Sequence, residues 1–214
     1  MKKTLLFCVA ILLLMSTVVS AEEILKDNSE ETISKETILE ETAKNVKKNN
    51  DDVKRNFEIQ LEYLNTNTEK NRDVKNYNVH VFQQFKQYKT LSLYRGLTVT
   101  RATGYSRPRG RGWLDSEGVG AGPAFMMRWT QPVSGKFSVA GDFTGSLMFY
   151  NKAHPADGRA YGFLWRAGPR LVWQSTDRDS ISLGYSIAHF SNGLRSHNPG
   201  YNGMGFTLNF QHKF

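Results

Sequence analysis

Cysteine is almost absent from this chain, which has one, Cys8, among its 214 residues. Cys8 lies in an N-terminal segment that we expect to be removed, so the mature chain would contain no cysteine. A disulfide framework, a cysteine-rich zinc site and a thiol nucleophile are therefore excluded. The mean hydropathy of −0.49 excludes a polytopic helical membrane protein. It does not exclude a β-barrel, whose strands are apolar on one face only.

The N-terminal apolar run, residues 5–15, is too short for a membrane anchor helix, which needs about 20 apolar residues. Two lysines precede this run, and Val19 and Ala21 occupy the minus-three and minus-one positions of a cleavage site. These features predict a secretory signal peptide over residues 1–21, cleaved after Ala21. A lipoprotein signal is excluded because Cys8 precedes the apolar core instead of following it.

Residues 22–55 contain no aromatic residue, glycine or proline, and they carry 7 Lys/Arg against 10 Asp/Glu. Apolar residues at helical spacing between Leu39 and Val53 allow a short or transient helix. So few apolar positions cannot offset the entropy lost on ordering, so the composition favours a flexible acidic extension, either a spacer or a partner-binding tail. Residues 56–214, in contrast, carry 19 basic and 10 acidic residues.

From residue 56 onward the hydropathy pattern has a period of two, which is typical of β-strands. The apolar face of residues 136–150 is formed by Phe137, Val139, Phe143, Leu147 and Phe149. The opposite face is polar, and in several segments it carries arginines. The strands are long, about 14 residues, and rich in aromatic residues on the apolar face. An apolar exterior in lipid around a polar interior fits this pattern better than a soluble sandwich does.

We predict an all-β fold of eight antiparallel strands, at residues 56–64, 77–87, 90–103, 118–131, 136–150, 159–175, 179–191 and 201–214. The connections would have 12, 2, 14, 4, 8, 3 and 9 residues, and such alternation of long and short is typical of outer-membrane barrels. The terminal Phe214 resembles the signal read by the barrel-assembly machinery. The sequence thus predicts an eight-stranded transmembrane β-barrel over residues 56–214, with its interior filled by side chains and its function on the loops or the outer wall.

The last predicted hairpin places polar side chains on the face that should meet lipid. In residues 181–191, His189 and Ser191 share the outward face with large apolar residues, and Asn202 has the same orientation on the next strand. Residues two apart on a strand are roughly 6.5–7 Å apart, so the side chains of His189 and Ser191 can meet. Polar groups at a membrane's edge suggest chemistry on lipid. The alternative is that both residues merely occupy the wet interface above the bilayer.

Residues 189–206, HFSNGLRSHNPGYNGMGF, resemble the lipid A 3-O-deacylases, outer-membrane acyl hydrolases of the PagL type. The motif of that family is His-x-Ser-Asn in the penultimate strand, followed by a loop and a third triad member. The resemblance extends more loosely from residue 90 to the C-terminus and does not cover residues 22–55. It implies that Ser191 is the nucleophile and His189 the general base. The third member is often a glutamate, whereas Asn202 occupies the nearest matching position here.

An asparagine as third member changes the chemistry, because an amide can orient an imidazole but cannot stabilise imidazolium by charge. In a serine protease the change from Asp to Asn costs about four orders of magnitude, mainly through the wrong tautomer. Asp115, Glu117 or Asp157 in the outer loops could supply the missing carboxylate. Asn192 and the Gly193 amide are the candidate donors to the developing oxyanion.

Arginine is concentrated in two of the predicted outer loops. Arg107, Arg109 and Arg111 alternate with proline and glycine, and Arg195 lies in the hairpin loop. Arginine binds phosphate through paired hydrogen bonds and lipid A is phosphorylated, so these side chains are candidate phosphate ligands. General attraction to an anionic membrane surface is the alternative. The export signal argues against nucleic acid as the partner of this basic loop.

Charged residues also fall on the faces that should line the barrel. We expect Arg128, Asp142, Arg166 and Arg170 to form a structural ion network there. No metal site and no cofactor are expected, because no carboxylate lies at ligand spacing from His189 or His197.

The sequence therefore predicts an outer-membrane carboxylic ester hydrolase that removes a 3-O-linked acyl chain from lipid A of lipopolysaccharide. Its partners would be lipopolysaccharide, other outer-membrane lipids and the assembly machinery. Two alternatives stay open. One is an inactive barrel of the same fold that binds lipid or stabilises the membrane, and the other is a general membrane esterase or phospholipase.

Overall fold

The computed structural model describes residues 56–66, 69–193 and 198–214. The predicted signal peptide, the acidic extension and Arg195 lie outside the described residues. None of the residues that are described belongs to an apolar helix of membrane-spanning length.

Nine β-strands make up the described chain, and all their pairings are antiparallel. They are β1 (Asn56–Asn65), β2 (Arg72–Tyr88), β3 (Leu91–Ser106), β4 (Leu114–Asp115), β5 (Gly118–Ser134), β6 (Phe137–His154), β7 (Arg159–Gln174), β8 (Asp179–Ser191) and β9 (Tyr201–Lys213). The eight predicted strands are therefore confirmed, and the two-residue β4 is added to them.

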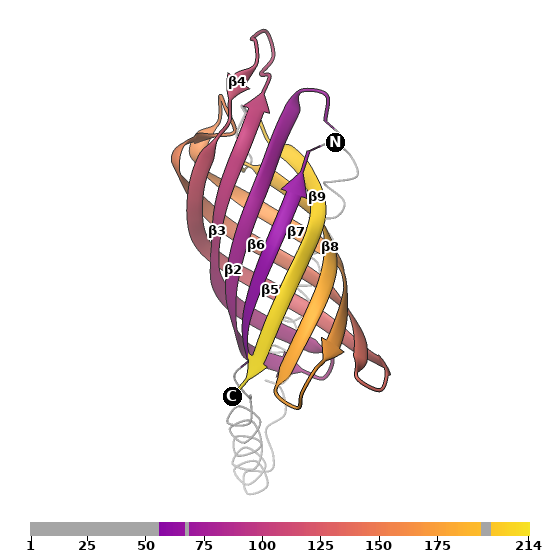
Figure 1. Cartoon of the computed structure of the whole chain (residues 1–214). Helices are drawn as coiled ribbons and strands as arrows, with labels where there is room; N and C mark the ends of the chain where they lie inside the picture. Colours follow the sequence, from indigo (N-terminus) through magenta and orange to yellow (C-terminus); the bar gives the residue numbers. More distant parts are fainter. Residues whose placement is uncertain (1–55, 67–68, 194–197) are drawn as a thin grey trace, which may run out of the picture. The chain divides into compact units, whose positions relative to one another are not determined.

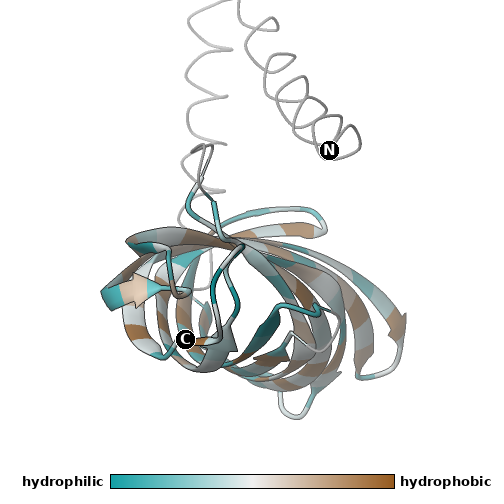
Figure 2. Ribbon diagram, turned by 90° about the horizontal axis from the view of Figure 1, so that it is seen from above, coloured by the Kyte–Doolittle hydropathy of each residue, from teal (hydrophilic) through white to brown (hydrophobic). Residues whose placement is uncertain are grey.

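Eight of these strands form a closed ring (Figures 1 and 2). Neighbours in sequence pair with one another, β3 pairs with β5, and β1 pairs with both β2 and β9. The pairing of β1 with β9 is continuous from Asn56↔Lys213 to Asn65↔Met204. The short β4 pairs with the end of β3 alone. The predicted eight-stranded antiparallel barrel is confirmed, and closure leaves none of its eight strands with a free edge.

The alternating pattern sets the sidedness of the barrel, and Figure 2 shows polar and apolar residues alternating along the strands. Large apolar side chains face outward: Leu97, Ile187 and Phe206 are 59%, 59% and 61% exposed. Charged side chains face the lumen, where Glu58 and His80 are fully buried. This arrangement inverts the usual distribution of a soluble protein.

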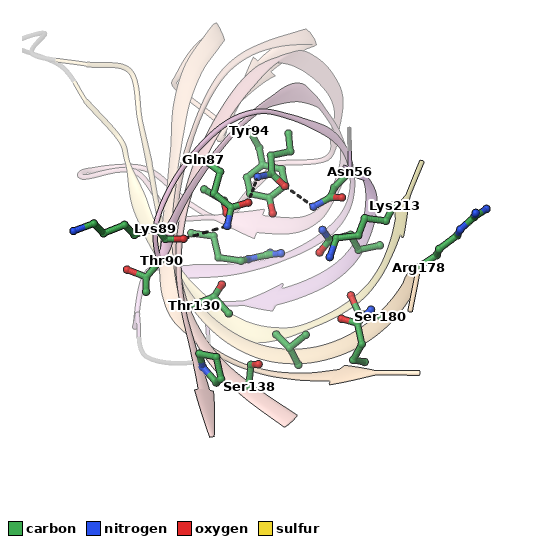
Figure 3. A pocket seen from close by; sticks show the side chains of 17 residues that line it. Asn56, Gln87, Lys89, Thr90, Tyr94, Thr130, Ser138, Arg178, Ser180 and Lys213 are labelled. Carbon is green, nitrogen blue, oxygen red and sulfur yellow. Dashed lines mark hydrogen bonds between the residues drawn. The ribbon is translucent and has the colours of Figure 1, made fainter. Parts of the chain in front are cut away.

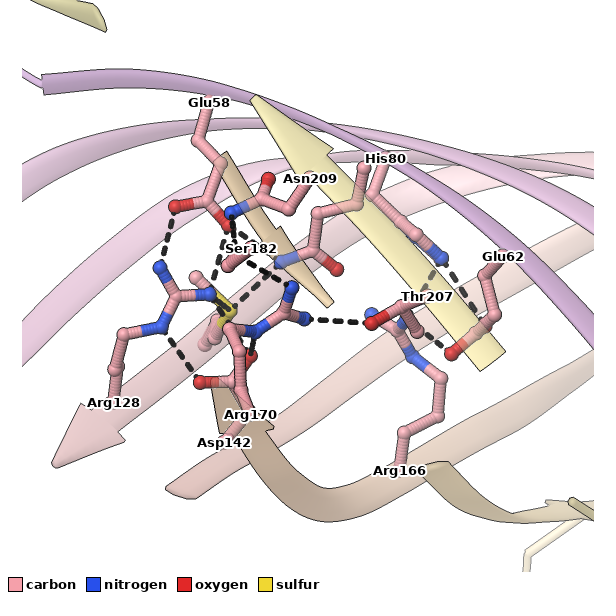
Figure 4. Close-up of polar contacts among 12 residues, drawn as sticks. Glu58, Glu62, His80, Arg128, Asp142, Arg166, Arg170, Ser182, Thr207 and Asn209 are labelled. Carbon is pink, nitrogen blue, oxygen red and sulfur yellow. Dashed lines mark hydrogen bonds and ion pairs between the residues drawn. The ribbon is translucent and has the colours of Figure 1, made fainter. Parts of the chain in front are cut away.

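The lumen is filled by charged groups that neutralise one another (Figure 4). Arg128 donates to both oxygens of Glu58 at 2.6 and 2.8 Å, and to Asp142 at 2.7 and 2.9 Å. Arg170 donates to Asp142 at 2.9 Å, and Arg166 lies 3.1 Å from Glu62. The predicted network of three arginines and Asp142 is confirmed for Arg128 and Arg170. Arg166 belongs to a separate group, and the two glutamates of β1 complete the charge balance.

The predicted alternation of long and short connections is wrong at one place. The β6–β7 connection has only the residues 155–158, the same length as the β7–β8 turn at 175–178. Both β2 and β6 extend further than predicted at this end of the barrel, β2 beginning at Arg72. The outward residues of the β2 extension, Asp73 and Lys75, are polar, so no alternation of apolar and polar residues marks this extension. We call this end, with residues 66, 69–71, 107–117, 155–158, 192–193 and 198–200, the loop end, and the opposite end the turn end.

Arg128→Met should destabilise the barrel strongly, because Glu58 and Asp142 would each lose their main buried counter-charge. Breaking a buried ion pair by removing one partner costs about 3–5 kcal/mol, and urea unfolding of the refolded protein in detergent would measure it. The matched control is Arg178→Met, which removes an exposed arginine at the turn end. Equal stability of the two variants would contradict the structural role of the network.

Candidate active site at the loop end of the barrel

The three predicted catalytic residues share the outward face at the loop end. His189 is exposed and Ser191 is partly exposed on β8, two residues apart, while the intervening Phe190 is buried. In the β8–β9 ladder His189 lies directly opposite Asn202. The predicted sidedness of all three residues agrees with the structure, and Asn202 faces His189 rather than Ser191.

A hydrogen bond joins His189 to Asn202, with 2.8 Å between Nδ1 of the imidazole and Oδ1 of the amide. An amide oxygen can only accept, so Nδ1 carries the proton in this contact. The other ring nitrogen, Nε2, is then unprotonated in the neutral imidazole and available as a base. This is the tautomer that a general base beside a nucleophilic serine requires.

Ser191 lies beside this pair without being joined to it. Within the described part of the chain, no hydrogen bond links its hydroxyl to His189. Catalytic hydrogen bonds in ligand-free enzymes are often long and tighten only when substrate binds. Ser191 and His189 therefore share the outward face of β8 and are separated by one residue.

A carboxylate that the sequence analysis missed, Glu69, stands behind Asn202. Its Oε1 accepts a hydrogen bond from the Asn202 amide Nδ2 at 2.8 Å and another from the Asn202 backbone N–H at 2.7 Å. Glu69 belongs to the β1–β2 connection, which reaches the start of β9 because β1 pairs with β9. The predicted closure of the barrel could have identified Glu69, because closure brings the β1–β2 connection next to the start of β9.

Two of the three carboxylates considered from sequence, Asp115 and Asp157, make other contacts. Asp115 accepts a hydrogen bond from Lys152 at 2.7 Å, and this bond holds the pKa of the Asp115 carboxyl below its usual range. The backbone N–H of Glu117 also donates to Asp115. Asp157 lies 3.4 Å from Arg111. The carboxylate that contacts the His189–Asn202 pair is Glu69.

The predicted oxyanion donors follow Ser191 at the start of the hairpin loop. Asn192 is only 4% exposed, and its backbone N–H donates to Oδ1 of Asn198 at 2.9 Å. Its side-chain Nδ2 is buried without a hydrogen-bond partner among the described residues. Gly193 has a φ of +81°, in the left-handed region that favours glycine. Neither donor of Asn192 is exposed beside Ser191, because its backbone N–H is engaged and its side-chain amide is buried.

A groove of about 340 Å³ runs along the outer wall beside this pair. Its lining includes His189 and Asn202 together with the apolar side chains of Phe143, Trp165, Ile187, Ala167 and Met204. Trp165 lies opposite His189 in the β7–β8 ladder and its ring stacks on Phe143 at 5.7 Å between centroids. The polar pair therefore lies against an apolar channel on the outside of the barrel.

The predicted arginines line a polar hollow of about 720 Å³ at the loop end. It contains Arg107, Arg109 and Arg111, and also Arg72, which the sequence analysis missed. The side chain of Arg72 donates to the Pro199 carbonyl at 3.1 Å. This contact links the arginine-lined hollow to the loop that follows Ser191.

A second polar hollow, of about 330 Å³, opens at the turn end of the lumen (Figure 3). Amide, hydroxyl and basic side chains line it, among them Asn56, Gln87, Lys89 and Lys213. It contains none of the predicted catalytic residues. Across the described residues, no group of three or more His, Cys, Asp or Glu side chains is arranged to hold a metal ion.

Comparison with protein families gives one decisive result. The family described as lipid A 3-O-deacylase (PagL) matches residues 75–211, nearly two thirds of the chain. The chain belongs to the lipid A 3-O-deacylase family. The matched residues include His189, Ser191 and Asn202 but not Glu69, which lies before the first matched residue.

Among solved structures, this chain is similar to a crystal structure of the outer membrane enzyme PagL, with 14% sequence identity and a TM-score of 0.46. The match covers 74% of this chain and 99% of the PagL chain. This chain is also similar to Neisserial surface protein A, at 8% identity and a TM-score of 0.48, covering 75% of this chain and 96% of that one. Comparison with curated protein sequences found no match.

Proposed function

We propose that this protein is an outer-membrane enzyme that removes a 3-O-linked acyl chain from lipid A, with Ser191 as nucleophile and His189 as general base. The observation that carries the proposal is a hydrogen-bonded polar pair, His189–Asn202, that lies beside Ser191 and borders an apolar groove on the outer wall. Exposing polar side chains to lipid costs free energy, so polar groups found on such a surface indicate a functional site. Membership of the deacylase family supplies the substrate class.

The reaction would proceed through an acyl-enzyme. Ser191 Oγ attacks the ester carbonyl while His189 Nε2 accepts the serine proton, and the C–O bond to the sugar then breaks as His189 returns that proton to the sugar oxygen. Water, deprotonated by the same nitrogen, attacks the acyl-serine carbonyl. The acyl C–O bond to Ser191 then breaks, His189 returns the proton to Ser191 Oγ, and the fatty acid leaves. The Gly193 N–H would stabilise the oxyanion in both steps.

Two surfaces next to the site match the two halves of lipid A. The apolar groove begins at His189 and would hold the acyl chain. The hollow lined by Arg72, Arg107, Arg109 and Arg111 would bind a phosphate of the glucosamine backbone, because guanidinium groups bind phosphate through paired, charge-assisted hydrogen bonds. With the loop end at the outer leaflet, both surfaces would face lipid A directly.

Ser191→Ala should abolish the release of the 3-linked chain, since loss of a triad nucleophile lowers kcat by at least about 10³-fold. Mass spectrometry of lipid A from cells expressing wild type or variant measures the loss of one acyl chain. The matched control is Ser186→Ala, a serine on the same strand whose side chain faces inward.

The same experiment separates the alternatives. Unchanged lipid A with altered phospholipids would indicate a general esterase or phospholipase. Identical lipids with wild type and Ser191→Ala would indicate a structural barrel, and would contradict the proposed function.

Ile187→Trp should narrow the groove two residues below His189. Loss of well-packed apolar contacts in a binding pocket costs about 1–3 kcal/mol, so kcat/KM for long-chain esters should fall roughly tenfold or more, while a short-chain ester of the same alcohol should be hydrolysed as before. The control is Leu183→Trp, equally exposed on the same face of β8 but outside the groove. Equal losses for long and short chains would show that the groove does not hold the acyl chain.

Arg109→Gln should raise KM for phosphorylated lipid A with little change in kcat, because one charge-assisted hydrogen bond is worth about 1.5–3 kcal/mol. Dephosphorylated lipid A, assayed in the same mixed micelles, should be processed equally by variant and wild type. Arg178→Gln at the turn end is the control for general attraction to an anionic surface. If this control raises KM as much as Arg109→Gln does, the arginine hollow is not a phosphate site.

A further inference from the structure

We propose that Glu69 is a positioning residue that sets the tautomer of His189 through Asn202. This inference rests on the proposed function and extends it to a residue outside the family match. The proposed site then contains four groups. Ser191 and His189 take part in the reaction, Asn202 orients His189, and Glu69 orients Asn202.

Glu69 is held in place by the turn that carries it. Its backbone N–H donates to the Thr66 carbonyl at 2.9 Å, and its own carbonyl accepts from the N–H of Arg72 at 3.2 Å. The Thr66 hydroxyl in turn contacts the carbonyls of Arg72 and Val74, each at 3.2 Å. The carboxylate therefore reaches Asn202 from a hydrogen-bonded turn between two strands of the closed barrel.

The direction of the two amide contacts fixes how Asn202 faces His189. An ionised carboxylate only accepts hydrogen bonds, so the group of Asn202 that points at Glu69 must be its NH₂. The amide oxygen is then left to face Nδ1 of His189, 2.8 Å away. Rotating the amide by half a turn would place its oxygen against the carboxylate and its NH₂ against His189.

That rotated state is the one that would inactivate the site. An NH₂ group facing Nδ1 donates a hydrogen bond, so Nδ1 must be unprotonated to accept it. The imidazole proton then lies on Nε2, and Nε2 can no longer act as the base. The same fault explains the roughly 10⁴-fold loss when asparagine replaces aspartate in a serine protease. Glu69 excludes this state here, because its Oε1 accepts from both the backbone and the side chain of Asn202.

Glu69 also supplies the negative charge that Asn202 lacks. During the reaction His189 becomes imidazolium, and a carboxylate one amide group away stabilises that cation. The chain thus has an acidic group for its triad, although the position adjacent to histidine is neutral.

The proposal is tested on the full mature chain in detergent micelles with Glu69→Gln, Asn202→Asp and the double variant. Glu69→Gln should lower kcat by at least about tenfold, towards the roughly 10⁴-fold limit set by a wrong tautomer, with KM little changed. Glu117→Gln, a change of another loop-end carboxylate, is the matched control and should change neither kcat nor KM.

The double variant distinguishes an electrostatic role from a structural one. Asn202→Asp alone places two carboxylates against each other, whereas in the Glu69→Gln background it gives His189 a direct carboxylate partner. We therefore expect Asn202→Asp to lower activity in the wild-type background and to restore it in the Glu69→Gln background. If Glu69 merely anchors the turn to β9, the second change would not rescue the first, and the proposal would be overturned.

Nitrogen NMR of histidine-labelled protein reads the same contact without any turnover. His189 should be protonated at Nδ1 in the wild type, and its tautomer should be altered in Glu69→Gln. An altered His189 signal in a protein that deacylates nothing would support the role of Glu69 while removing the proposed function. An active wild type whose His189 signal and kcat are unaffected by Glu69→Gln would overturn the inference alone.

Discussion

Closure of the hydrogen-bonded sheet is the constraint on which this structure depends. Each of the eight ring strands pairs on both sides, since β1 pairs with β9 as well as with β2. A closed ring has only two faces, so the period-two pattern must send one set of side chains into the lumen and the other outside. The buried charges then have to neutralise one another, and the Glu58–Arg128–Asp142–Arg170 contacts do so. Sidedness, in turn, puts His189 and Ser191 on the outer wall.

Closure also assembles the site from distant parts of the chain. His189 and Asn202 meet because β8 and β9 are adjacent in the hairpin. Glu69 meets Asn202 because the first and last strands of the ring pair, which brings together residues 133 positions apart. The arginine-lined hollow depends on the same neighbourhood, since Arg72 follows Glu69 in the same connection and contacts Pro199. Ser191, His189 and the groups that contact His189 thus lie at the same end of the barrel as the arginine-lined hollow.

An asparagine in a position usually taken by an acid is therefore less of a defect than it seems from sequence. What the imidazole needs from its neighbour is an acceptor at Nδ1 and a nearby negative charge. In this chain the two requirements are divided between Asn202 and Glu69. An amide can serve as the acceptor provided that something fixes its orientation, and a carboxylate on its far side does that.

The sequence by itself determined the strands, their sidedness and the His189–Ser191 face, because a residue period of two is a local property that is visible wherever one face is apolar. The same reasoning failed at the loop-end extension of β2, where the outward residues Asp73 and Lys75 are polar and the alternation disappears. Only the tertiary structure decided that Arg166 belongs with Glu62 and that Glu69 supports Asn202. Those contacts join strands or loops far apart in the chain, and their geometry follows from barrel register and closure, which no local pattern encodes.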